Sequence, residues 1–368
     1  MNAPAKEYDG IHKYIRITDI DEQTSAYKQD DVVSPDAELE EKYKVKENDI
    51  LFARTGASTG KSYLYDINDG VLYYAGFLIR GNVKIDNNAK FVFLQTKTSN
   101  YKNWVGIMSA RSGQPGINSQ EYSSYRFRIP SKAEQNKIAQ VFSLIDDRIQ
   151  TQIGAIEKLK SLISSLNDKL QFQFCNEVNL SFSEIGNDYS GLSGKSANDF
   201  GRGKPYIPYT NIYANTFVDD SQFDLVEINE GEHQCRVLNG DVLFTLSSEV
   251  PEEVCVGSVY LGNEKELYLN SFCFGVHINS NKIHSPYLAY FVKSSIFRHT
   301  VYPLAQGSTR FNLQKSDFLK RKFSFPNIEH QIKIANVLMA IDSKLKIEQK
   351  LLEQYKLQKQ YLLSQMFI

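Results

Sequence analysis

The residues most suggestive of chemistry lie in a glycine- and hydroxyl-rich stretch, residues 55–62, which reads TGASTGKS. Such residues resemble the phosphate loop of nucleotide-binding enzymes, but that loop needs a glycine five residues before its Gly-Lys pair. This chain has Thr55 at that position, so the spacing is one residue short. The following residues, 63–65, predict a strand, whereas a phosphate loop opens a helix whose N–H groups hold the anion. The stretch therefore argues against nucleotide hydrolysis.

No other set of residues has the spacing of a catalytic or metal site. Asp36 and Glu40 faintly resemble the carboxylates of a metal-dependent nuclease, which converge from neighbouring strands. Here they lie four residues apart in a polar stretch, which we interpret as a solvated face. The six histidines show no metal-ligand or triad spacing, and no adenine-methyltransferase motif occurs. The sequence therefore predicts no catalytic residue, no metal ligand and no cofactor in this chain.

Three polar, glycine-containing segments carry side chains suited to nucleic acid instead. They are residues 54–61, 109–118 and 306–312. Arg, Gln, Asn, Ser and Thr can address base edges and phosphates, and glycine permits close approach. The second and third segments precede two similar helical segments at equivalent places. This recurrence favours a binding role over the alternative of ordinary exposed loops.

A long predicted helix occurs twice and must position these segments. Residues 130–172 recur at 326–368, and eight of the twenty positions 130–149 are identical at an offset of 196. A proline precedes each copy, where its fixed φ is compatible with a helix start. The identical pairs are Pro130/Pro326, Gln135/Gln331, Lys137/Lys333, Ile138/Ile334, Ala139/Ala335, Val141/Val337, Ile145/Ile341 and Asp146/Asp342.

Apolar residues recur at steps of three and four in both copies, as in Ile138, Phe142, Ile145 and Ile149. This narrow seam predicts coiled-coil packing. At 1.5 Å per residue, about forty residues make a rod of roughly 60 Å. The seam could also dimerise with another chain, but two copies in one chain make an antiparallel intramolecular pair the simpler solution.

The repeat extends beyond the helices, since residues 14–20 return at 206–212 and residues 45–52 at 237–244. Short aromatic or β-branched runs predict strands, and two further segments predict short helices. We therefore predict an α+β fold with two tandem mixed α/β domains, each followed by a long helix. The predicted strands are 50–53, 72–80, 242–246 and 272–278, and the predicted short helices are 90–98 and 286–293. The predicted divisions are 1–131 for domain 1, 132–175 for the first helix, 176–327 for domain 2 and 328–368 for the second helix.

Within this shared frame, residues 53–62 and 245–257 differ. Two different targets would produce this divergence, and so would ordinary drift after duplication.

The composition fits a folded protein, since 42% of the residues are hydrophobic and 12% aromatic. The N-terminal stretch has no apolar core of a signal peptide, and no run approaches a membrane span. The four cysteines are widely spaced and suggest isolated thiols in a reducing cytosol, so we expect a cytoplasmic protein with no membrane partner. A net charge of −1 means that any DNA contact must come from local clusters.

The motifs, in their order and duplication, resemble the specificity subunits of type I restriction–modification systems. They are NDILF at 48–52 with GDVLF at 240–244, GQPGIN at 113–118 with GSTRFN at 307–312, and the Pro…Gln…Ile-Ala pattern that opens each helix. The resemblance covers nearly the whole chain. It implies two target-recognition domains, two long helices packed antiparallel, and a chain that reads DNA without catalysis of its own.

The resemblance also implies a double-stranded DNA target that is asymmetric and bipartite, with half-site centres about one helical turn, roughly 10 bp, apart. The implied partners are two DNA methyltransferase (M) subunits and the restriction/translocase (R) subunits, which would bring S-adenosylmethionine, ATP and Mg²⁺. The residues expected at DNA are Arg54, Ser58, Lys61, Arg111 and Gln114 in domain 1, and Lys204, Ser247, Gln306, Thr309 and Arg310 in domain 2.

A second class of function is left open by the sequence. The chain could be a non-catalytic coiled-coil scaffold whose globular domains bind protein. Adjacent methyltransferase and helicase–nuclease genes would favour the specificity subunit.

Domain 1 departs from the family pattern at its start. Residues 182–192 precede the first shared motif of domain 2, and domain 1 has no counterpart to them. Only ten residues precede Ile11, and these match residues 193–202. We therefore expect domain 1 to be shortened at its N-terminus, with consequences for its first strand.

Overall fold

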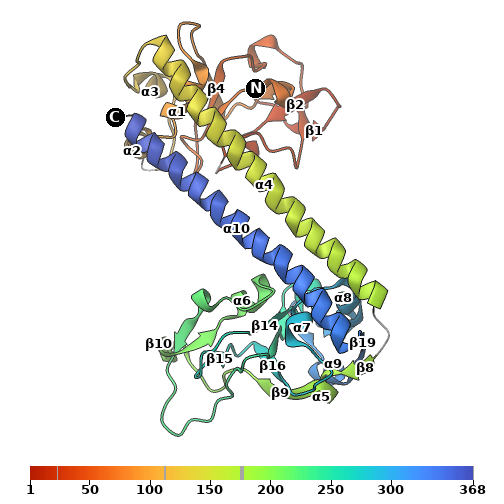
Figure 1. The fold of residues 1–368 in the computed structure, drawn as a ribbon. Helices are drawn as coiled ribbons and strands as arrows, with labels where there is room; N and C mark the ends of the chain where they lie inside the picture. Colours follow the sequence, from red (N-terminus) through yellow and green to blue (C-terminus); the bar gives the residue numbers. More distant parts are fainter. Residues whose placement is uncertain (23, 112, 175–177, 368) are drawn as a thin grey trace. The chain divides into compact units, whose positions relative to one another are not determined.

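The chain forms two compact units (Figure 1). Unit 1 comprises Met1–Ile153 and Lys350–Ile368, and unit 2 comprises Gly154–Gln349. The computed structural model describes residues 1–22, 24–111, 113–174 and 178–367. Cys175, the last residue of the first predicted helix, and Ser112 of the predicted 109–118 loop lie outside the described residues. The domain limits predicted from the sequence separate each globular domain from the long helix that follows it, and they stay a prediction.

Unit 1 holds a small mixed domain built on short sheets. Its three-stranded sheet has the order β5-β4-β7, in which β4 pairs antiparallel with both neighbours. In addition, β1 pairs antiparallel with β3, and β2 pairs parallel with β6. The strands are β1 (Ala5–Glu7), β2 (His12–Ile15), β3 (Val33–Pro35), β4 (Asp49–Ala53), β5 (Ser62–Leu64), β6 (Val71–Tyr74) and β7 (Leu78–Asn82). The short helices are α1 (Ala89–Gln95), α2 (Ser99–Met108) and α3 (Ser119–Ser124).

Two of the predicted elements of unit 1 are confirmed and one is wrong. The run 50–53 lies in β4, and the helix predicted at 90–98 is α1. The single strand predicted over 72–80 is wrong, because the chain turns between β6 and β7. Ala75 N donates to Ile15 O at 3.0 Å, and Leu78 N donates back to Ala75 O at 2.9 Å. As a result, β6 joins β2 and β7 joins β4.

Unit 2 repeats this architecture with more strands. Its main sheet has the order β14-β12-β16-β9, and smaller sheets have the orders β11-β10-β15, β13-β18-β17 and β19-β8. The strands predicted at 242–246 and 272–278 are β12 (Val242–Thr245) and β16 (Cys273–Ile278), and the helix predicted at 286–293 is α7 (Ser285–Phe291), so these predictions are confirmed. The other strands are β8 (Val178–Ser181), β9 (Gly186–Ser190), β10 (Phe200–Ile207), β11 (Asp224–Val226), β13 (Ser247–Ser248), β14 (Gly257–Val259), β15 (Tyr268–Leu269), β17 (Ala305–Gln306), β18 (Phe311–Leu313) and β19 (Lys322–Phe325). The other short helices are α5 (Phe182–Ile185), α6 (Tyr209–Ala214), α8 (Ser295–Val301) and α9 (Lys315–Lys320).

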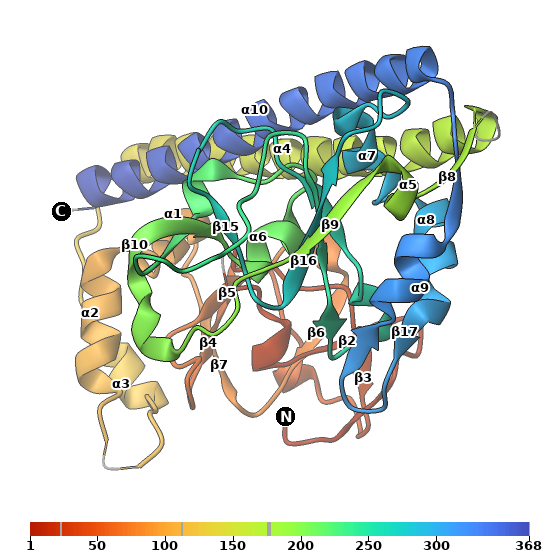
Figure 2. The same ribbon diagram turned by 90° about the horizontal axis from the view of Figure 1, so that it is seen from below.

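The main sheets of the two units differ at one edge. In unit 2, β9 pairs antiparallel with β16, and α5 lies between β8 and β9 in the chain (Figure 2). In unit 1, the counterpart of β16 is β7, and no described strand pairs with its outer edge. The core of unit 2 is correspondingly more complete, with Phe182, Phe244, Phe274 and Phe318 fully buried.

The two long helices, α4 (Lys132–Phe174) and α10 (Ile328–Met366), begin where side chains cap them. The Ser131 N–H donates to the Glu134 carboxylate at 3.0 Å, and the Glu134 N–H donates to Ser131 Oγ at 3.4 Å, which is a capping box. Asn327 Oδ1 accepts the His330 N–H at 2.9 Å, an N-cap bond. These local bonds explain why both helices start just after their prolines.

A repeated glutamine docks each long helix onto its domain. Gln135 Oε1 accepts the Asn88 N–H at 2.8 Å, and the Gln135 amide donates to Pro130 O at 3.0 Å. Gln331 makes the same pair of bonds, from the His284 N–H and to the Pro326 carbonyl, both at 2.8 Å. Both glutamines are buried. Burial with satisfied hydrogen bonds explains their identity in the repeat, because an unpaired buried amide would be costly.

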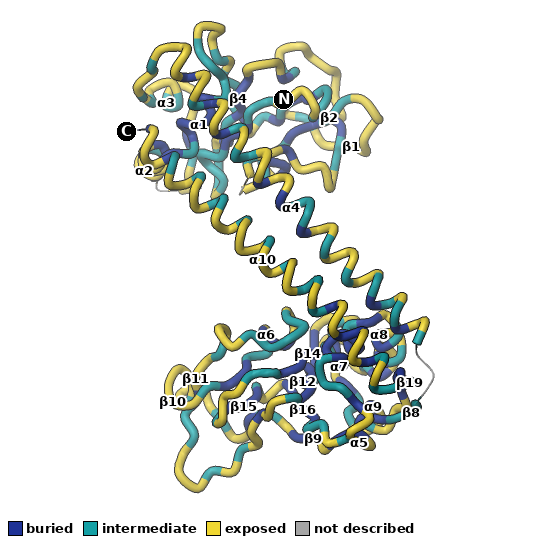
Figure 3. The backbone as a smooth tube through the Cα atoms, in the orientation of Figure 1, coloured by how far each residue is buried: buried dark blue, intermediate teal, exposed yellow. Residues whose placement is uncertain are grey.

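The helix contacts within each unit are antiparallel. In unit 1, Phe142 near the start of α4 packs against Leu363 and Phe367 near the end of α10. In unit 2, Leu170 near the end of α4 packs on the core that holds Ile334 near the start of α10. The predicted antiparallel helix pair is therefore confirmed. Much of α10 between these ends is exposed (Figure 3).

Candidate nucleic-acid interface

Two of the polar segments predicted in unit 1 lie together. Thr55 forms an isolated bridge with Gly116, and Gly56 N donates to Pro115 O at 2.9 Å. Next to them, Ile117 N donates to Arg54 O, also at 2.9 Å. Residues 54–61 and the described part of 109–118 are therefore one loop pair, fixed by backbone hydrogen bonds at the end of β4.

Unit 2 contains the same loop pair at equivalent positions. β13 pairs with β18, so that Ser247 faces Asn312, the counterparts of Thr55 and Gly116 at offsets of 192 and 196. Leu313 N donates to Leu246 O at 2.8 Å, which repeats the bond between Ile117 and Arg54. β17 extends this pair to a three-stranded ribbon. The two units thus present one backbone frame with different side chains.

The predicted residues of loop pair 1 (residues 54–61 and 109–118) differ in whether their side chains are exposed and free to contact a ligand. Arg54 is exposed and makes no side-chain hydrogen bond or ion pair with another described residue. Gln114 is also exposed, with its amide beside Gly56. Arg111, in contrast, donates to both Glu121 carboxylate oxygens at 2.8 and 2.7 Å and to Gly116 O at 3.0 Å. Arg111 therefore closes its own loop in this structure.

The other two residues predicted in unit 1 lie at the far end of the same loop. Lys61 Nζ lies 3.7 Å from Glu22 Oε2, and its side chain is 22% exposed. Ser58 is half-buried, and its carbonyl oxygen accepts the Lys61 N–H at 3.0 Å. Both residues are on the loop, but Arg54 and Gln114 offer the more open polar groups.

Loop pair 2 (residues 246–248 and 305–313) presents three exposed predicted residues, Gln306, Thr309 and Arg310. The Arg310 guanidinium lies 5.2 Å from the centre of the exposed Phe272 ring. This cation–π contact orients the cation without neutralising its charge. Phe272 was not predicted. Only the fold brings this aromatic residue beside the 306–312 loop, so the sequence carried no sign of it.

The remaining predicted residues of unit 2 lie apart from that exposed tip. Ser247 is 5% exposed, and its carbonyl oxygen accepts the Tyr209 hydroxyl at 2.9 Å. Lys204 lies on β10 and forms an ion pair with Glu266. Thus the structure groups Gln306, Thr309 and Arg310 on one exposed loop, and it buries Ser247 on the neighbouring strand β13. DNA contact by any of the ten residues stays a prediction.

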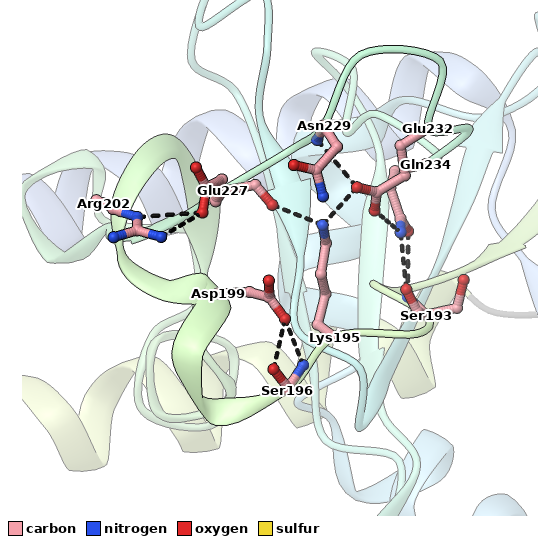
Figure 4. Close-up of polar contacts among 9 residues, drawn as sticks. All are labelled: Ser193, Lys195, Ser196, Asp199, Arg202, Glu227, Asn229, Glu232 and Gln234. Carbon is pink, nitrogen blue, oxygen red and sulfur yellow. Dashed lines mark hydrogen bonds and ion pairs between the residues drawn. The ribbon is translucent and has the colours of Figure 1, made fainter.

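Basic side chains near β10 are also neutralised by neighbouring carboxylates (Figure 4). Lys195 Nζ lies 2.5 Å from Glu232 Oε2 and donates to Glu227 O at 2.6 Å. Arg202 pairs with the Glu227 carboxylate at 2.7 Å. The Lys195 ammonium lowers the pKa of Glu232 to about 2, so this carboxylate stays ionised at neutral pH. These ion pairs join the segment around Lys195 and Arg202 to the segment around Glu227 and Glu232. They leave little unpaired positive charge there.

Sequence reasoning missed the tyrosine that holds loop pair 1. The Tyr122 hydroxyl donates to Ala53 O at 2.6 Å and accepts the Gly60 N–H at 3.2 Å, so one side chain joins both ends of the 54–60 turn. Burial raises the pKa of Tyr122 to about 12, which keeps this hydroxyl protonated. A lone tyrosine in α3, a helix that the sequence analysis did not predict, gave no signal of this role.

The structure also shows the surroundings of the segments that faintly resemble a phosphate loop and a nuclease metal site. Residues 55–62 lead into strand β5, as expected, and not into a helix. Asp36 lies 3.9 Å from the Lys6 ammonium, and Glu40 lies 2.6 Å from that of Lys42. No group of three His, Cys, Asp or Glu side chains that could hold a metal ion occurs among the residues described. Likewise, no helix within the described ranges is long and apolar enough to cross a bilayer.

Comparisons with known proteins agree with this architecture. The family model of the type I restriction modification DNA specificity domain matches twice, over residues 2–161 and 192–357. The specificity subunit of the type I restriction enzyme MjaVIII from Methanocaldococcus jannaschii is 24% identical over 371 aligned residues, which cover 93% of this chain and 82% of that protein.

Two solved structures share the fold. The S subunit of a type I restriction–modification system from M. genitalium has a TM-score of 0.58 and 16% identity, covering 100% of this chain and 93% of that one. A chain from a structural study of complex assembly and conformational transition in the type I R-M system has a TM-score of 0.57 and 14% identity, covering 95% and 90%.

Proposed function

The chain belongs to the type I restriction–modification DNA specificity family, and on this basis we propose that it reads a bipartite, asymmetric DNA target with its two loop pairs. Each unit would read one half-site. Loop pair 1 would use Arg54 and Gln114, and loop pair 2 would use Gln306, Thr309 and Arg310. Arginine and glutamine suit this role because they form paired hydrogen bonds with guanine and adenine edges in the major groove.

The observation that carries the proposal is the repeated loop pair. The bridge between Thr55 and Gly116 and the pairing of Ser247 with Asn312 occupy equivalent positions in the repeat. One frame with two sets of side chains supports two half-sites of different sequence. A palindromic target would instead require similar side chains in both units.

The charge distribution supports binding as part of a complex. The net charge is −1, and Lys204, Arg202 and Lys195 are paired with carboxylates. Phosphate neutralisation supplies much of the affinity of DNA-binding proteins. We therefore propose that partner subunits provide most phosphate contacts and that this chain alone binds DNA weakly.

The long helices offer surfaces for those partners. Val141 and Val337 are identical in the repeat, yet they are 39% and 48% exposed. Exposed apolar residues at equivalent helix positions support docking of two similar methyltransferase subunits, one on each unit. Restriction/translocase subunits would join through them, with S-adenosylmethionine, ATP and Mg²⁺ bound by the partners. Catalysis by this chain itself is not part of the proposal.

The experiment that tests the proposal is a genome-wide map of adenine methylation after co-expression of this chain with its methyltransferase subunit. One asymmetric, bipartite motif is expected, and replacing residues 1–131 by another domain 1 should change one half only. A stable complex that methylates no motif would contradict the reading function of unit 1 or unit 2. Absence of any complex would favour the protein-binding scaffold.

A further inference from the structure

An exposed phenylalanine occupies the same place in both units, directly beside the loop pair. Phe77 precedes β7, and Phe272 precedes the counterpart strand β16. These two strands start at Leu78 and Cys273, which pair with the last residues of β4 and β12. Phe77 is 62% exposed, and Phe272 is 52% exposed. Each unit therefore carries an apolar ring on its surface next to the segments proposed to read DNA.

Backbone hydrogen bonds hold the two phenylalanines in the same way. Arg54 N donates to Phe77 O at 3.0 Å, and Leu246 N donates to Phe272 O at 2.9 Å. A tight turn precedes each ring. It is closed by Leu78 N donating to Ala75 O at 2.9 Å in unit 1 and by Cys273 N donating to Asn270 O at 3.0 Å in unit 2. The backbone of each phenylalanine is thus tied to the first residue of its loop pair.

The phenylalanine is the same in both units although its surroundings differ. Between residues 73–82 and 268–277, aligned at an offset of 195, the identical pairs are Tyr73/Tyr268 and Phe77/Phe272. Burial explains the tyrosines, which are 6% and 4% exposed. A single exposed apolar residue is common in proteins, but the same exposed ring at both equivalent places gains little from packing. A role at the surface explains why both units have it.

The polar side chain of the loop pair changes where the ring does not. In unit 2 the Arg310 guanidinium lies over the Phe272 ring, 5.2 Å from its centre. Unit 1 has Gln114 at the position of Arg310, at the offset of 196 that relates Gly116 to Asn312. Both polar residues are exposed. The ring is therefore the feature common to the two loop pairs, and the hydrogen-bonding residue is the variable one.

The major groove of DNA offers one apolar group to such a ring. The base edges there carry hydrogen-bond donors and acceptors, together with the C5-methyl group of thymine, which phenylalanine can contact. Insertion between base pairs would need both faces of the ring, whereas the guanidinium covers one face of Phe272. A methyl contact needs only one free face or edge. The cation–π contact therefore favours a thymine methyl over insertion between bases.

We propose that Phe77 and Phe272 are further DNA-specificity residues, each packing against the C5-methyl group of a thymine in the half-site of its own unit. This inference rests on the proposed function and adds an apolar contact to the polar contacts of the loop pairs. The contact selects a thymine by its methyl group, without a hydrogen bond to the base. Each half-site then contains one thymine whose methyl group contributes to binding.

Deoxyuridine tests the methyl contact, because it pairs as thymine does and lacks the C5-methyl group. The probe is a duplex carrying the motif from the methylation map, with each thymine replaced in turn by deoxyuridine. It is bound to the complex of this chain with its methyltransferase subunit. We expect one thymine in each half-site at which the replacement weakens binding about three- to fivefold, as for one methyl group withdrawn from its contact. Unchanged binding at every thymine of a half-site would overturn the proposal for that unit.

Variants of the phenylalanines connect the methyl group to the ring. Phe272→Ala should weaken binding by a similar factor and abolish the deoxyuridine effect in one half-site, and Phe77→Ala should do so in the other. Loss of the ring and loss of the methyl group are then not additive, because they remove the same contact. If deoxyuridine weakens binding of these variants as much as binding of the unchanged chain, the methyl contact is wrong.

Matched controls replace exposed apolar residues at the other end of each sheet. Leu238 is 52% exposed and lies before β12, and Ile67 is 81% exposed and follows the end of β5 that pairs with the start of β4. Leu238→Ala and Ile67→Ala should bind DNA normally and keep the deoxyuridine effect. Unchanged unfolding temperatures establish that all four variants fold. A loss of affinity in the controls equal to that of the phenylalanine variants would overturn the proposal.

The remaining outcomes separate this inference from the function on which it rests. If the complex methylates no motif, the proposed function fails and the methyl contact fails with it. If a motif is methylated and Arg310→Ala weakens one half-site while both phenylalanine variants bind normally, the proposed function stands and the methyl contact is wrong. If Phe272→Ala weakens binding and the deoxyuridine effect persists, the ring only positions Arg310, and the methyl contact is again overturned.

Discussion

Units 1 and 2 share a loop frame but differ in the sheet that supports it. In unit 2 the four-stranded sheet buries Phe244 completely, whereas in unit 1 the counterpart Phe52 borders a cavity on a three-stranded sheet. Even so, the bonds Ile117–Arg54 and Leu313–Leu246 are the same within 0.1 Å. The loop frame therefore depends on the central strand and the segment before the long helix, and the edge strand contributes mainly to stability.

The largest expected effect comes from replacing the equivalent phenylalanines Phe52 and Phe244, which tests whether the two cores differ in packing. Phe244→Ala should destabilise unit 2 by about 3–5 kcal/mol, because it opens a cavity in a fully packed core. Phe52→Ala should cost only about 1–2 kcal/mol in unit 1, because the ring is already partly exposed. Denaturant unfolding followed by hydrogen exchange reports the two units separately. Equal losses would show that the cavity of unit 1 does not weaken its core.

Replacing the docking glutamines tests a feature that the units share. Gln135→Leu and Gln331→Leu should each cost about 1–3 kcal/mol, because each change leaves partly buried backbone groups unpaired. The same hydrogen-exchange measurement applies, with Lys137→Ala and Lys333→Ala as controls on the same helix turns. A large loss for only one glutamine would show that the two helices dock by different means.

Half-site recognition is the next comparison. Arg310→Ala should weaken binding of the proposed methyltransferase complex at the half-site proposed for unit 2 by about 5- to 150-fold, equivalent to about 1–3 kcal/mol for a base contact. Arg54→Ala should affect the other half-site. Arg202→Ala is the matched control, since Glu227 already neutralises that guanidinium. Affinities for DNA with either half-site scrambled report the effect, and an equal effect of Arg202→Ala would argue against base reading by Arg310.

The smallest effect concerns two lysines at equivalent positions. Burial lowers the pKa of Lys97 to about 7 and that of Lys293 to about 8. The folded protein then binds fewer protons than the unfolded chain between these values and the ordinary 10.5, so stability rises with pH across that window. Lys97→Met should therefore raise the unfolding temperature most at pH 6, with a gain that shrinks toward pH 10.

Lys293→Met should behave similarly in unit 2 with a smaller gain, because its pKa is less depressed. Unfolding temperatures at pH 6, 8 and 10 give the comparison. A gain that is constant over this range would mean that neither ammonium is destabilised by burial.

The long helices and the separate polar loop segments could be predicted because they depend on local patterns that the chain repeats, whereas the pairing of the loops could not. Apolar residues at helical spacing and a proline before each copy suffice to predict α4 and α10. The motifs GQPGIN and GSTRFN mark the loops, but the register predicted between them is wrong by two residues, because Gly116 is the counterpart of Asn312 in the structure. The family resemblance added the expectation that the two domains read different half-sites.

The details of the site depend on contacts between distant residues, and the sequence carries no local sign of them. Lys204 and Glu266 are 62 residues apart, and their ion pair results from the alignment of β10. Ser247 is buried because a neighbouring helix places Tyr209 over it. The break between β6 and β7 arises because Leu78 N donates back to Ala75 O in a turn, after which β7 pairs with β4 instead of β2. Each depends on tertiary geometry that periodicity does not encode.

Tyr122 connects two surfaces of unit 1, because its ring lines the cavity while its hydroxyl binds Ala53 O and the Gly60 N–H. A ligand that orders this ring would also order the 54–60 turn. Thermodynamic linkage then requires reciprocity. If a ligand in the cavity increases the affinity for DNA by some factor, DNA increases the affinity for that ligand by the same factor. Tyr122→Phe would remove both hydroxyl bonds while keeping the ring, and would reduce this coupling in both directions equally.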